Sequence, residues 1–84
     1  MMWFWPPVPV RLIANSGITY EVKAVEICLE QMHTWPVPDT GKRGPKWKKA
    51  EKAVYAALEG MGEPKAARDA FEAAAAEAGV LRSR

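Results

Sequence analysis

The chain has 84 residues but only one cysteine and one histidine, Cys28 and His33. A single cysteine cannot form a disulfide within the chain, so we expect a reducing compartment, the cytoplasm. A structural zinc site uses about four nitrogen or sulfur ligands, and two such residues are too few within one chain. Because these residues lie about 140° apart around a helix axis, we do not expect a nucleophile–base pair. We interpret them as a core cysteine and a helix-end histidine.

Long apolar runs are also missing. No stretch approaches the ~20 apolar residues of a membrane span, so we expect no membrane partner. The apolar opening, Met1 to Trp5, has no basic residue and meets Pro6-Pro7 too early for a signal peptide. The net charge of +2 is too small to indicate a class of partner by itself.

Two segments early in the chain predict an antiparallel β-hairpin over residues 8–23, preceded by an apolar segment, residues 1–7. The second half of the hairpin alternates apolar and polar residues, which is the period of a half-buried strand. The side chains predicted to face inward are Ile18, Tyr20 and Val22. Pro9 cannot donate to a ladder, so we expect it at a strand start or on a sheet edge.

After the hairpin the apolar period changes to 3.6 residues, which predicts three helices. Their ranges are 24–35, 45–59 and 63–79, with a Pro- and Gly-rich loop over 36–44. The first helix should end before Pro36, because the residue preceding a proline is pushed out of the helical region. Pro45 and Pro64 suit the first turns of the other two. Either Gly60 or Gly62 can end the second helix in the left-handed conformation, and Gly79 can end the third.

The same period predicts which side chains of the last two helices are buried. For residues 45–59 and the turn after them, the stripe is Trp47, Ala50, Val54, Ala57, Leu58 and Met61. For residues 63–79 it is Ala67, Ala70, Phe71, Ala74 and Ala78, with Val80 folding back on the helix end. Arg68 and Glu72 are expected to form an exposed pair. The sequence therefore predicts a single α+β domain, ββααα, whose hairpin is covered by helices.

This order of features resembles the small rhizobial proteins catalogued as domain of unknown function 982. The residues that carry the resemblance are a Pro-Val-rich first strand, Trp35-Pro36 after a helix, the run from Ala56 to Gly60, and the run from Ala67 to Ala74. It extends over roughly residues 4–81. The resemblance implies an α+β fold and supplies no activity, cofactor or catalytic residue.

The carboxylates give no indication of catalysis. Pairs such as Glu26 and Glu30 lie on faces expected to be solvated, whereas a general acid needs a pKa raised by burial. Gly41 to Gly44 lacks the spacing of a phosphate-binding P-loop. We therefore expect a protein that is not an enzyme and that holds no metal or cofactor.

A basic run in the middle of the chain carries one functional hypothesis. Half of the lysines and arginines fall within eleven residues: Lys42, Arg43, Lys46, Lys48, Lys49 and Lys52. They lead into a predicted helix N-terminus, where free N–H groups and positive charge could bind phosphate. Against this, charge runs are usually solvated faces, and Trp47 is predicted in the core instead of on a stacking platform. Nucleic-acid or polyanion binding is therefore our alternative function.

Aromatic residues at the N-terminus carry the other hypothesis. Trp3, Phe4 and Trp5 either cover the open end of the small core or form an interface, where aromatics are enriched. Our leading interpretation is a small cytoplasmic protein that acts by non-catalytic interaction with a protein partner or with itself as a homodimer.

Overall fold

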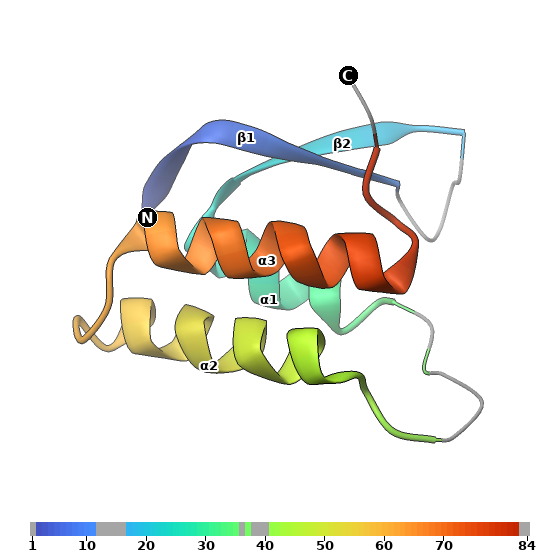
Figure 1. Cartoon of the computed structure of the whole chain (residues 1–84). Coiled ribbons are helices and arrows are strands. Elements are labelled where there is room, and N and C mark those ends of the chain that lie inside the picture. The colour runs from blue at the N-terminus through green and yellow to red at the C-terminus, as the bar shows by residue number, and fades with distance from the viewer. Residues whose placement is uncertain (1, 12–16, 36, 38–40, 83–84) are drawn as a thin grey trace.

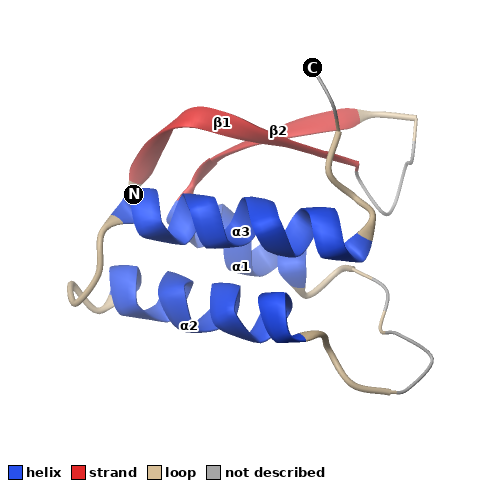
Figure 2. Cartoon of the chain, viewed as in Figure 1, coloured by secondary structure: helices blue, strands red, loops and turns tan. Residues whose placement is uncertain are grey.

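A computed structural model of the chain describes residues 2–11, 17–35, 37 and 41–82. It has the predicted α+β order of an antiparallel hairpin followed by three helices (Figure 2). The elements are β1 (Trp3–Arg11), β2 (Thr19–Ala24), α1 (Val25–Met32), α2 (Pro45–Leu58) and α3 (Pro64–Ala78). Residues 12–16 of the predicted hairpin lie outside the described residues.

The elements form layers with α3 in the middle. The hairpin lies along one side of α3 and α2 along the other, while α1 lies behind α3 (Figure 1). α3 contacts β1, α1 and α2, and α1 also contacts β2 and α2. The apolar faces of all five elements therefore converge on one small core.

The first strand is longer than predicted, because it begins at Trp3 and includes most of the segment assigned to residues 1–7. Its pairing with β2 is irregular: Trp3 lies opposite Ala24, yet the next pair is Val8 with Val22. Between these two pairs β1 therefore advances by five residues, whereas β2 advances by only two. Pro6 and Pro7, which have no N–H to donate, lie within this irregular stretch, so the proline pair shapes the strand instead of preceding it.

The end of the chain adds to the sheet. Leu81 forms a bridge with Val10, the Arg11 N–H donates to the Val80 carbonyl (2.8 Å), and the Arg82 N–H donates to the Pro9 carbonyl (2.9 Å). On the side of β1 that faces the chain end, Pro9 takes part only as an acceptor through its carbonyl, so this pairing does not require the N–H that proline lacks. β1 is therefore central, and β2 lies at the edge of the sheet.

The inward face of β2 was predicted correctly only at Val22, which is fully buried. Ile18 is 48% exposed and Tyr20 is 37% exposed. Ile18 precedes β2 and Tyr20 is its second residue, and this turn end of the hairpin extends beyond the end of α3 (Figure 1). The alternation correctly indicated a strand, but only part of that strand has a core beneath it.

The first helix is shorter than the predicted range 24–35, ending at Met32, after which the backbone turns. Ala24 provides no side-chain cap. The N-terminal segment takes over this role, because the Val25 N–H donates to the Met2 carbonyl (2.9 Å) and the Met2 N–H donates to the Glu26 carboxylate (3.0 Å). This hydrogen bond from Met2 lowers the pKa of Glu26.

α2 and α3 end within about a residue of their predicted limits, and the glycine turns are as expected. Gly60 and Gly79 have φ of +77° and +75°. Beyond Gly79 the chain folds back, with Val80 fully buried and its N–H donating to the Ala75 carbonyl (3.0 Å). This is the helix-ending turn predicted from the sequence.

Several predicted core positions are wrong at the helix ends. Met61 is 81% exposed, because the chain has already left the helix at Gly60 and the helical period no longer applies. Leu58, in the last turn of α2, is 37% exposed. In α3, Ala75 is buried and Ala78 is exposed, so the stripe stops one turn earlier than predicted. The centre of the stripe is correct, since Phe71 is fully buried.

Candidate functional site

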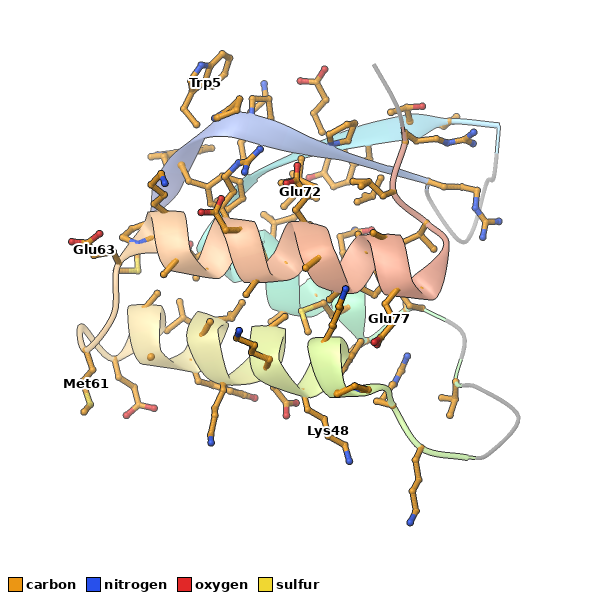
Figure 3. All side chains as sticks on the ribbon, in the orientation of Figure 1. Trp5, Lys48, Met61, Glu63, Glu72 and Glu77 are labelled. Carbon is orange, nitrogen blue, oxygen red and sulfur yellow. The ribbon has the colours of Figure 1, made fainter. Side chains whose placement is uncertain are left out.

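A basic pocket lies beside the first half of α2. It has a volume of about 780 Å³ and is lined by Lys42, Arg43, Trp47, Lys48, Lys49, Glu51 and Lys52. Five of the six predicted cations are thus brought together, and Lys46 is not among them. Five cations against one carboxylate give the lining a formal charge of +4. In Figure 3, Lys48 points away from α3 into solvent.

The inner wall of this basic pocket is held by hydrogen bonds and stacking. Arg43 Nη1 donates to the Trp35 carbonyl (2.7 Å), and its guanidinium carbon lies 4.8 Å from the ring centroid of Trp47. Trp47 is only partly buried, contrary to prediction, and its Nε1–H donates to the Met32 carbonyl (3.2 Å). Met32 is the last residue of α1, and its carbonyl also accepts the Trp35 N–H (3.3 Å). Trp47 therefore packs against the edge of the core and also lines the basic pocket.

The helix N-terminus beside the basic pocket is already occupied by a carboxylate. The Lys46 N–H lies 3.4 Å from Oε2 of Glu77, which reaches across from α3. A Cβ on Gly44 would collide with the same carboxylate. Figure 3 shows Glu77 directed from the end of α3 toward the first turn of α2. One of these N–H groups, that of Lys46, therefore already faces a carboxylate, and phosphate binding at this helix start stays a prediction.

The lysines on the outer wall of the basic pocket are not neutralised. Lys48, Lys49 and Lys52 are exposed, and within residues 2–11, 17–35, 37 and 41–82 none of them forms a salt bridge. α2 also has no acidic residue in its first turn. The uncompensated positive charge is thus concentrated on one flank of one helix.

Four large apolar side chains of the hairpin are exposed: Trp3, Trp5, Ile18 and Tyr20. Trp3 and Tyr20 lie together beside β2 and form a second surface, the hairpin patch. Of the three predicted aromatics, Phe4 covers the core at 8% exposure, while Trp3 and Trp5 are 65% and 77% exposed. Figure 3 shows Trp5 pointing away from the helices. The strand alternation of β1 explains this division, because neighbouring residues face opposite sides.

Beside the edge strand β2, the hairpin patch meets a smaller groove of about 300 Å³. The groove is lined by Trp3, Tyr20, Glu21, Lys23, Ala24 and Ile27. We did not predict it from the sequence. It depends on α1 packing under β2, which brings Ile27 next to Trp3 across 24 residues of chain.

The potentially reactive side chains do not come together. Cys28 is fully buried, and burial raises the pKa of its thiol to about 12, so little of the nucleophilic thiolate exists at neutral pH. His33 is exposed and contacts the ring of Trp47, with 5.7 Å between centroids. Among the described side chains, no group of three or more His, Cys, Asp or Glu residues could hold a metal ion. None of the described helices has the length and apolar character needed to cross a bilayer.

Comparison with known proteins gives one match. The family model described as "Protein of unknown function (DUF982)" matches residues 7–82. No curated protein and no solved structure matches the chain.

Proposed function

The chain belongs to the DUF982 family, whose description assigns no activity, and we propose that it acts non-catalytically by pairing with a second copy of itself through the edge strand β2. The single observation that carries the proposal is the exposure of two tryptophans, Trp3 and Trp5, on a hairpin whose outer strand lies at a sheet edge. Tryptophan is enriched at the centres of protein interfaces. A cytoplasmic setting fits the buried free thiol of Cys28.

The position of β2 favours strand addition. An edge strand readily accepts another strand through main-chain hydrogen bonds. The groove formed by Trp3, Tyr20 and Ile27 runs beside this edge, so a strand added to β2 covers apolar surface as well as backbone.

The charge order of β2 favours a second copy as the occupant. When two β2 strands pair antiparallel with Val22 opposite Val22, Glu21 of each copy lies opposite Lys23 of the other. Opposite charges in directly facing positions stabilise a sheet, and like charges destabilise it. Shifting the pairing so that Glu21 faces Glu21, or Lys23 faces Lys23, loses this advantage. The strand is therefore complementary to itself in one register.

A charge swap tests this register. We expect the molar mass measured by sedimentation to rise with protein concentration. Lys23→Glu places Glu21 opposite an acid in both symmetric pairs, so dimer formation should weaken by about tenfold or more. The double variant Glu21→Lys/Lys23→Glu exchanges the charges and should restore association. An equimolar mixture of the single variants Lys23→Glu and Glu21→Lys should form a heterodimer, because each strand then faces the opposite charge.

Lys65→Glu provides the control, because it changes the charge by the same amount on α3, away from β2. It should leave association unchanged. A chain that remains monomeric at every concentration contradicts the proposal, and the hairpin patch would then serve a different protein. A dimer that tolerates Lys23→Glu as well as Lys65→Glu also contradicts it.

A further inference from the structure

We infer that the basic pocket binds the phosphate backbone of nucleic acid without reading its sequence, through Lys48, Lys49 and Lys52. This inference is independent of the pairing of two copies through β2, because the basic pocket and the groove beside β2 have no lining residue in common.

The first argument is that the lysines are placed against local stability. Lys48 and Lys52 are four residues apart on one helix, where like charges repel each other. Lys48 is the fourth residue of α2, so it lies near the positive dipole end of the helix. Departures from local stability rules are expected at functional sites. A bound polyanion would relieve both unfavourable interactions.

The second argument concerns the class of ligand. The face of Trp47 is covered by Arg43 at 4.8 Å, and the ring is held by its hydrogen bond to Met32. Arg43 therefore already takes up one aromatic face of Trp47, and the cations that line the basic pocket are its main means of recognition. Acidic protein partners usually bind through buried apolar anchors with charges at the rim, whereas a phosphate backbone is recognised by charge alone. Backbone binding of this kind carries no sequence preference.

A salt titration with a short fluorescent DNA duplex tests the inference. For the native chain we expect a Kd of roughly 10⁻⁴–10⁻⁶ M at physiological salt, with affinity that falls as salt rises. Each duplex phosphate contact adds about 0.9 to the log–log slope. Lys48→Gln/Lys52→Gln should weaken binding and flatten the slope by up to about 1.8. Circular dichroism should show that the fold is kept, since both side chains are exposed.

The matched control is Lys65→Glu, which lowers the net charge by the same two units on α3. It should leave the salt slope close to that of the native chain. Equal losses in the two variants would mean that net charge alone attracts DNA, and would overturn the basic pocket as the site. Absence of binding at low salt would overturn it too. Equally effective competition by polyglutamate would overturn the assignment to phosphate and indicate an acidic protein partner.

Discussion

α2 and α3 are neighbouring helices of 14 and 15 residues that both begin with proline and bury small side chains against each other, yet their charges are arranged in opposite ways. On α3, Lys65 and Arg68 pair with Asp69, and Arg68 also pairs with Glu72. On α2, Lys48, Lys49 and Lys52 form no salt bridge within the described residues. The amphipathic pattern alone would not distinguish the two helices.

This contrast separates two roles. α3 lies between the hairpin and α2, and both its apolar stripe and its charges contribute to holding those elements together. α2 contributes its apolar stripe to the core but leaves its solvent face charged and uncompensated. One face of a helix can therefore stabilise the fold, while the charges on its other face reflect a function and not stability.

The largest effect on stability is expected when the one bulky side chain on the apolar stripe of α3 is removed. Phe71 is fully buried, and its ring centroid lies 5.3 Å from that of Trp35. Phe71→Ala should lower the free energy of unfolding by about 3–5 kcal/mol, measured in urea, because it leaves a cavity in the core. Tyr55→Ala on the solvent face of α2, where Tyr55 is 45% exposed, should change it by less than about 0.5 kcal/mol. Similar losses in the two variants would refute this division of roles.

The next test concerns Arg68, which was expected on an exposed face. Its side chain is only 13% exposed, since Nε donates to the Pro6 carbonyl at 2.8 Å and ties the irregular part of β1 to α3. Arg68→Ala should lower the free energy of unfolding by about 1.5–3 kcal/mol, the range for hydrogen bonds to charged groups. Lys65→Ala, at a side chain that is 79% exposed, should lower it by less than about 0.5 kcal/mol. If thermal melts showed equal effects, Arg68 would be only a surface charge.

These cases show what the sequence could and could not reveal. Element order was predictable, because apolar periodicity and the proline and glycine stops act within a few residues. The partners of Arg68 and Glu77 were not, because Pro6 is 62 residues from Arg68 and Lys46 is 31 from Glu77. The basic pocket was predictable as a list of cations, but its inner wall depends on where α1 ends. No local pattern encodes such distant contacts.

A smaller effect is expected where α3 caps α2. Gly44 has φ of −70°, so alanine suits its backbone, but the added Cβ would displace the Glu77 carboxylate. Gly44→Ala should lower the free energy of unfolding by about 0.5–1 kcal/mol, because alanine is a poor cap and the charge near the helix N-terminus moves away. In a Glu77→Ala background the loss should be smaller, and a double-mutant cycle measures the difference. Strictly additive effects would show that the cost of Gly44→Ala does not come from displacing Glu77.

The smallest effects should have opposite signs on the two helices. Lys48→Gln/Lys52→Gln removes repulsion along α2, so the free energy of unfolding should rise by a few tenths of a kcal/mol at low salt. Asp69→Asn removes the partner of Lys65 and Arg68, so the free energy of unfolding should fall by a similar amount. Both differences should shrink near 1 M salt, where the screening length is about 3 Å. A loss of stability in the lysine variant would mean that these lysines support the fold.

Acid should separate the two variants further. The hydrogen bond from Arg68 lowers the pKa of Asp69 in the folded chain, so the stability it adds is present above the pKa of the unfolded chain and is lost as pH falls through the folded value. The difference between Asp69→Asn and the native chain should therefore disappear in acid. The gain in Lys48→Gln/Lys52→Gln does not depend on the Asp69 carboxylate, so it should persist wherever the fold does. If instead that gain vanished in step with the Asp69 difference, the lysines of α2 would be coupled to carboxylates after all, and their positive charge would no longer be in surplus.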